Sequence, residues 1–128
     1  MEVLRGVSWE KAAARPIAGA HTIWEIALHV AAWAEIGRLR ASGTAVGEVA
    51  PEQDWPAVDD ASEDGWRRTV DVLEQSEARL AEVVLGLSDS QLSAMAAGQP
   101  YSVYFLLHGV VQHNVYHAGQ IALLKKMG

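Results

Sequence analysis

The stretch that most constrains the fold of this chain is its last quarter, Tyr101 to Gly128. Its apolar residues recur at helical spacing, which predicts one helix over residues 102–126. At a rise of 1.5 Å per residue such a helix is roughly 37 Å long, enough to span a domain. The same helix carries His113 and His117 one turn apart. We therefore expect the rest of the chain to pack along this helix and to bring a further group to the two histidines.

Two further long helices are predicted upstream, over residues 22–42 and 62–86, and two short ones over residues 9–15 and 88–96. A serine or threonine cap opens each of the four, and a glycine or proline marks each end. No run of alternating β-branched residues is long enough for a strand. Three long helices joined by a long loop and a short helical segment predict an all-α, up-down helix bundle. The 128 residues fit one domain of common size, residues 1–128.

The predicted helix over residues 22–42 has a recognisable inward side. Its apolar stripe consists of Ile23, Ile26, Ala27, Val30, Ala34 and Gly37. His29 and Trp33 fall next to Ile26 on this stripe, whereas Arg38 and Arg40 are expected to face outward. The stripe therefore predicts that the His29 imidazole points towards the interior of the bundle.

The segment over residues 43–60 is predicted to be a loop, because it contains two glycines, two prolines and several acids. A loop of this length is unusual in a compact domain, and such loops are often functional. Trp55, just before Pro56, is an aromatic anchor that can fold the loop over another part of the molecule.

Composition excludes several classes of function. The chain has no cysteine, which removes disulfides, cysteine nucleophiles and thiolate metal ligands. Its net charge is −6 and its ten Lys and Arg are scattered, so we expect no nucleic-acid partner. No apolar run approaches the length of a membrane span, and the N-terminus lacks the apolar core of a signal peptide. The expected location is the cytoplasm, with no membrane partner.

His113 and His117 are the first candidates for chemistry. Residues four apart on a helix point the same way, with Cβ atoms about 5–6 Å apart, so two imidazoles can reach one ion. Both interrupt an apolar stripe, and adjacent buried imidazoles without an ion would each need hydrogen-bond partners. Two interpretations stay open: a metal-binding pair, or a coincidence of spacing. The order His-Asn-Val-Tyr-His lacks the glutamate of a zincin motif, so that mechanism is not supported.

His29 is the candidate for a third ligand, because it interrupts the apolar stripe of a different long helix. A lone histidine on such a face is more often a satisfied core residue, but the pair on the last helix needs a further ligand. Three protein ligands leave one position open for water or substrate, which is typical of catalytic rather than structural sites.

Four other residues are further candidates for roles near such a site. Glu25 has capping-box spacing to Thr22 and is interpreted as a cap first and a candidate base second. Gln120 is either a partner of His117 or ordinary packing. His108 lies about 140° around the helix from His113, so it is expected at the surface or in a subunit contact. His21 is interpreted as a residue of the helix boundary without a metal role.

Two segments of this chain resemble the DinB/YfiT-like superfamily: residues 20–33, AHTIWEIALHVAAW, and residues 113–121, HNVYHAGQI. Asp54-Trp55-Pro56 and the helix that opens at Ser62 also fit, so the resemblance covers nearly the whole chain. It implies an up-down four-helix bundle with a divalent metal, zinc or nickel, held by His29, His113 and His117.

The resemblance also implies a function. Members with known activity are mostly thiol-dependent: they transfer bacillithiol or mycothiol, or isomerise a substrate with such a thiol as cofactor, and homodimers are common. For this chain we expect a metal-dependent transferase of such a low-molecular-weight thiol, or a related hydrolase, acting on a small-molecule substrate. The alternative is a non-catalytic metal-binding module for stress response or interaction. Members usually begin with a further long helix before the part equivalent to residues 4–15, whereas this chain starts almost inside that connector. Either the bundle is shortened or an apolar groove is filled by another subunit, and we expect an oligomer.

Overall fold

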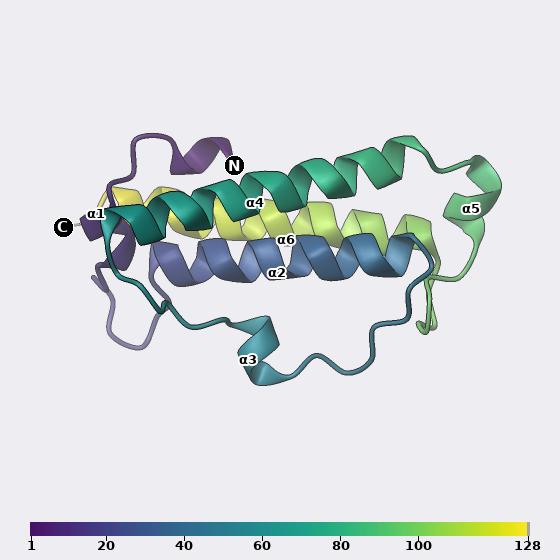
Figure 1. Ribbon diagram of the computed structural model, residues 1–128, viewed down its shortest axis with the longest axis horizontal. Helices are drawn as coiled ribbons and strands as arrows, with labels where there is room; N and C mark the ends of the chain where they lie inside the picture. The colour runs from purple at the N-terminus through teal and green to yellow at the C-terminus, as the bar shows by residue number, and fades with distance from the viewer. Residues whose placement is uncertain (128) are drawn as a thin grey trace.

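The computed structural model describes residues 1–127 and is built on three long helices (Figure 1). These are α2 (Ile23–Ala41), α4 (Glu63–Leu85) and α6 (Val103–Lys125). The short elements η1 (Glu2–Leu4), α1 (Trp9–Ala13), α3 (Pro51–Asp54) and α5 (Asp89–Ser93) lie before and between them. The described residues form no sheet, and the prediction of an all-α fold with three long helices is confirmed. No helix within this range is long and apolar enough to cross a membrane.

The predicted caps fix where the long helices begin. Thr22 Oγ1 accepts from the backbone N–H of Glu25 at 3.1 Å, and the Glu25 carboxylate accepts from the N–H of Thr22 at 2.8 Å. Ser62 and Ser102 cap α4 and α6 with one bond each, because their side chains accept from the N–H of Gly65 and of Phe105. Each cap satisfies amide groups that have no partner within the helix, and such a contact is worth roughly 0.5–2 kcal/mol.

The short helices differ from prediction. Helix α1 ends at Ala13 and α5 ends at Ser93, both earlier than expected. After α5 the backbone turns into α6 through bonds between Val103 N–H and Ala94 C=O and between Ala96 N–H and Tyr101 C=O. The predicted loop after α2 contains α3, which proline opens and whose Gln53 side chain accepts from the N–H of Ala50.

Helix α2 packs against both other long helices (Figure 1). The predicted stripe is confirmed, because all six of its residues are buried. On the α4 side the rings of Trp24 and Trp66 meet edge to face at 5.3 Å, next to the fully buried Leu73. On the α6 side, Gly37 lies so close to Val110 that an added Cβ would be 3.2 Å from its Cγ2. The lack of a side chain at Gly37 therefore lets α2 and α6 approach closely at this point.

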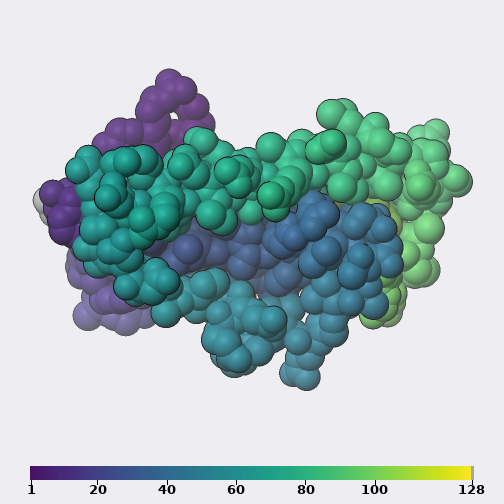
Figure 2. Space-filling view, in the orientation of Figure 1, coloured from purple at the N-terminus to yellow at the C-terminus, as the bar shows by residue number. Residues whose placement is uncertain are grey.

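The segment before α1 completes the core at one end of the molecule. Leu4 is buried in the main apolar cluster. The Trp66 indole donates to Val7 C=O at 2.9 Å, and Lys125 Nζ donates to Val3 C=O at 2.8 Å. These contacts tie the N-terminal segment to α4 and α6. The space-filling view shows α4 and α2 side by side, with α3 and its flanking loop protruding along the edge of α2 (Figure 2).

The prediction that Arg40 faces outward is wrong. Arg40 is buried, and its guanidinium carbon lies 5.9 Å from the centre of the Trp33 ring. The turn before α6 covers this end of α2: the N–H of Ala97 donates to Arg40 C=O, and Nη1 of Arg40 donates to the Tyr101 hydroxyl. Seven residues make almost two full helical turns, so Arg40 lies on the same side of α2 as Trp33, and the prediction went wrong by assigning the face from the charge of the residue. Arg38 is partly exposed and pairs with Glu35 at 2.6 Å.

Candidate metal centre

Three imidazoles meet at the middle of the α2–α6 contact. The rings of His29 and His113 are 4.8 Å apart, those of His29 and His117 are 4.8 Å apart, and those of His113 and His117 are 4.4 Å apart. One ring nitrogen from each residue lies within 4.8 Å of the other two. His29 and His117 are buried and His113 is partly buried. The structure therefore brings together the three residues that the sequence singled out.

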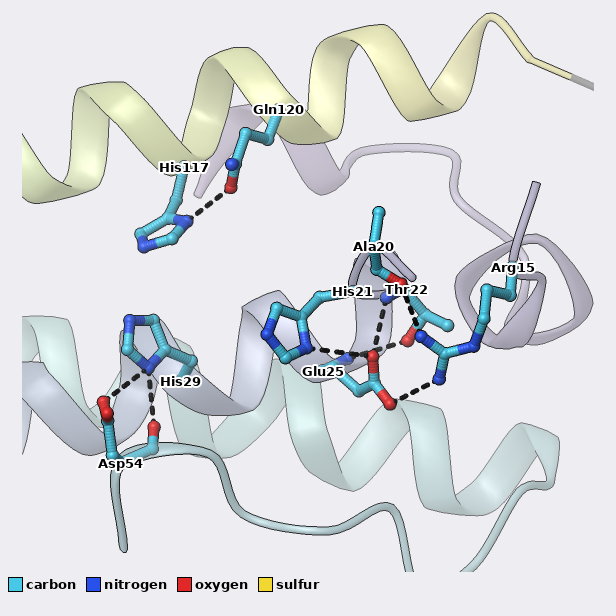
Figure 3. A network of polar contacts seen from close by, with 9 residues as sticks. All are labelled: Arg15, Ala20, His21, Thr22, Glu25, His29, Asp54, His117 and Gln120. Atoms are coloured by element: carbon cyan, nitrogen blue, oxygen red, sulfur yellow. Dashed lines mark hydrogen bonds and ion pairs between the residues drawn. The ribbon is translucent and has the colours of Figure 1, made fainter. Parts of the chain in front are cut away.

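Hydrogen bonds orient two of the three rings (Figure 3). Nδ1 of His29 lies 2.6 Å from Asp54 C=O, and Nδ1 of His117 lies 2.7 Å from the Gln120 side-chain oxygen. An oxygen of this kind only accepts, so each Nδ1 carries the proton and each Nε2 keeps its lone pair. Partners of this type fix the tautomer and direction of metal-binding histidines. The open question about Gln120 is settled, since it is the partner of His117.

The loop between α2 and α4 covers the His29 side of the cluster. The Trp55 ring is sandwiched between His21 at 3.5 Å and His29 at 3.8 Å, nearly parallel to both. The Trp33 indole donates to the Asp54 carboxylate at 2.7 Å. Trp55 is thus the aromatic anchor predicted for this loop, and its ring holds His29 against the bundle.

Electrostatics favours neutral imidazoles. Burial lowers the pKa of His113 to about 4, helped by the nearby rings of His117 and His29. Burial likewise lowers the pKa of His29, although the Asp54 carbonyl acts in the opposite direction. Neutral imidazole is the form that binds a metal ion. At neutral pH both rings therefore offer uncharged nitrogens.

The donor set fits a divalent transition metal ion. His29 Nε2 and His113 Nε2 are 2.9 Å apart, so in the metal-free protein His113 donates to the lone pair of His29. Two imidazole nitrogens on a tetrahedral zinc ion are about 3.3 Å apart, given bonds of about 2.0–2.1 Å. For this pair a shift of a few tenths of an ångström and loss of the shared proton suffice, whereas the widest separation in the cluster, up to 4.8 Å, must contract further. Three histidines suit zinc, copper, iron or nickel rather than calcium or magnesium.

The remaining candidates lie away from the cluster. His108 is exposed and contacts the Tyr104 ring, as expected from its helical angle. His21 stacks on Trp55 and is not one of the three converging residues. Glu25 caps α2 and also binds Arg15 at 2.7 Å and His21 at 3.3 Å (Figure 3). Burial acts to raise the pKa of Glu25, but the contacts with Arg15 and Thr22 outweigh it and lower that pKa, so Glu25 is poorly suited as a base.

Two pockets flank the cluster. One, of about 380 Å³, extends from His29 and His113 along α2 and α6 to Arg40 and Tyr101. The other, of about 360 Å³, reaches His117 and is bounded by His21 and Trp55. Small molecules can therefore approach the imidazoles from two directions.

Sequence reasoning missed two residues near the site. Asp54 was noted only as part of a resembling tripeptide, yet it contacts His29 and Trp33. Arg40 was placed on the outer face, yet it lines the larger pocket. The acidic residue directly before an anchoring tryptophan is the one signal for Asp54, and the signal for Arg40 is its spacing of seven residues from Trp33, which puts both on one helical face.

Fold and site together define a helical protein with a buried three-histidine cluster that can hold a metal ion. The family model of the DinB superfamily matches residues 1–121, and the chain belongs to that superfamily. Searches of curated proteins and of solved structures give no match. The family and its fold are thus known, whereas no individual relative supplies a reaction.

Proposed function

We propose that this protein binds a divalent transition metal ion, zinc or nickel, through His29, His113 and His117. The observation that carries this proposal is the convergence of three ring nitrogens within 4.8 Å, two of them oriented by Asp54 and Gln120. The lowered pKa values of His29 and His113 keep these rings in the form that binds metal.

We further propose that the site catalyses the transfer of a low-molecular-weight thiol to a small-molecule substrate. Such an ion, when bound, lowers the pKa of a coordinated thiol or water and so supplies a nucleophile near neutral pH. Three protein ligands leave one position free, and the pocket of about 380 Å³ beside His29 and His113 has room for a substrate. Trp33 and Val110 give this pocket apolar walls. A related hydrolase would use the same features with water in place of the thiol.

Metal content tests the first proposal. Protein purified without a His tag, stripped with chelator and reloaded is expected to retain about one equivalent of zinc or nickel per chain. His113→Ala should retain less than a tenth of an equivalent, because two ligands bind far more weakly than three. His108→Ala, on the same helix but outside the cluster, is the matched control and should load like the wild type. Equal loading of His113→Ala and the wild type would contradict the proposal.

Thiol conjugation to an electrophile, with and without chelator, tests the second proposal. A rate that falls on chelation and returns with metal supports transfer. A metal-loaded protein without such activity would instead support the non-catalytic alternative, in which the same site serves stability or partner docking.

We also propose that the protein forms a homodimer. Helix α6 exposes six large apolar side chains: Tyr104, Phe105, Val111, Val115, Tyr116 and Leu123. Exposed apolar surface on this scale is typical of interaction sites. Sedimentation at micromolar concentration is expected to give twice the chain mass, and a stable monomer there would contradict the proposal.

A further inference from the structure

At the end of the larger pocket away from the histidines, α2 carries a buried cation without an anionic partner. Arg40 is 8% exposed, and within residues 1–127 it takes part in no ion pair. Its Nη1 donates to the Tyr101 hydroxyl at 3.3 Å, while its buried Nε has no hydrogen-bond partner. Burying a charge without a partner is costly, so this guanidinium indicates a ligand that supplies the anion.

The pocket connects this cation to the three histidines. The Arg40 guanidinium carbon lies 5.9 Å from the Trp33 ring centre, which lies 6.2 Å from the His113 ring centre. The distance from the Arg40 guanidinium carbon to the His113 ring centre therefore cannot exceed the sum of these two distances. The wall between them is apolar, formed by Trp33, Ile36 and Val110. One small molecule can thus contact both ends.

Charge within the pocket is unevenly placed. Asp54 is the one carboxylate among the lining residues, and it lies at the histidine end, where Trp33 donates to it and His29 Nδ1 is 3.2 Å away. The opposite end offers no carboxylate among the lining residues: the Tyr101 oxygen accepts from Arg40, which leaves the Tyr101 O–H and the guanidinium as donors. Contact with the Trp33 ring partly stabilises the guanidinium, but it leaves Nε unsatisfied.

We propose that the pocket binds a small organic acid, with its carboxylate on Arg40 and Tyr101 and its apolar body along Trp33 and Val110. The planar guanidinium fork matches a carboxylate, and the few donors at this end suit that group better than a phosphate dianion. The far end of the acid then lies beside His29 and His113. Only the assignment of that end as the reacting end rests on the proposed function; the carboxylate subsite does not.

Calorimetry on chelator-treated protein tests this subsite without involving a metal. The probes are 4-phenylbutyrate and its neutral isostere 4-phenylbutyramide. Because hydrogen bonds to charged groups are strong, we expect the acid to bind at least about tenfold more tightly than the amide. Arg40→Met should remove this preference. Arg38→Met, two residues earlier and paired with Glu35 at the surface, is the matched control and should keep it.

Equal affinity for acid and amide, or wild-type affinity for the acid in a folded Arg40→Met variant, would overturn the proposal. So would binding of the acid only to zinc-loaded protein regardless of Arg40, since the ion would then be its receptor. If Arg40→Met fails to fold, Tyr101→Phe removes only the hydroxyl and should weaken the acid about threefold while leaving the amide unchanged. If the protein binds no metal but still prefers the acid to the amide, the proposed function is contradicted and the carboxylate subsite stands.

Discussion

The two sides of helix α2 differ in what they bury. Towards α4 it buries an apolar contact, with Trp24, Trp66 and Leu73 in the core and a single internal polar bond from the Trp24 indole to Thr69. Towards α6 it buries His29 and Arg40 beside His117 and a pocket. Apolar contacts stabilise a fold, whereas buried polar groups without full partners lower stability. The comparison indicates that the α4 side maintains the fold and the α6 side carries the candidate metal site.

The largest effect is expected from the α4 side. Leu73 is fully buried, so Leu73→Ala should lower the free energy of unfolding by about 2–5 kcal/mol through lost transfer energy and a cavity. Denaturant unfolding measures this loss. Val72→Ala, at the neighbouring half-exposed position, should cost far less. The comparison would fail if Leu73→Ala were harmless, or if it abolished metal binding while still folded.

Metal binding should stabilise the protein through the α6 side. Zinc at about 100 times its dissociation constant is expected to add about 2.7 kcal/mol to the free energy of unfolding, because the ion binds the folded form. The increment should vanish in His113→Ala and persist in Leu73→Ala, as followed by chemical unfolding with and without zinc. An increment in His113→Ala equal to that of the wild type would place the ion elsewhere.

A smaller effect is expected from the residues that orient the histidines. Gln120→Ala removes the partner of His117 Nδ1 and should weaken metal affinity by about 10–100-fold, measured by competition with a chromophoric chelator. Gln112→Ala, on the exposed side of the same helix, should bind like the wild type. No difference between the two variants would mean that packing alone orients His117.

A further effect concerns the acid stability of the metal-free protein. The pKa of His113 is 6.5 in the unfolded chain and about 4 in the folded protein. Between pH 6.5 and about pH 4 the unfolded chain therefore binds a proton at His113 and the folded protein does not. Stability should therefore fall as pH drops from 6.5 to about 4. Thermal melts across this range should show a shallower slope for His113→Leu. An equal slope in the two proteins would assign the effect to other groups.

In the metal-loaded protein, low pH is expected to release the metal. Protons and the ion compete for the same nitrogens, and because burial lowers the pKa of His113 to about 4, metal loss is expected only as the pH falls towards that value. Equilibrium dialysis at graded pH measures it. Retention of a full equivalent well below about pH 4 would indicate ligands other than imidazole.

The sequence by itself determined the three long helices and the identity of the cluster. Capping residues such as Thr22 and Ser62 are local patterns, and so are the two apolar stripes, one interrupted by His29 and the other by His113 and His117, because each lies within one helix. The spacing of the last two histidines fixes their common face, because four residues make about one helical turn.

Only the tertiary structure decided what surrounds those rings. Asp54 reaches His29 across 25 positions of the chain, and Tyr101 reaches Arg40 across 61. Such contacts depend on how loops fold over helices, which local periodicity does not encode. Arg40 lies within about 20° of Trp33 around α2, but only the turn before α6, which covers this end of the helix, makes it the buried cation of a pocket.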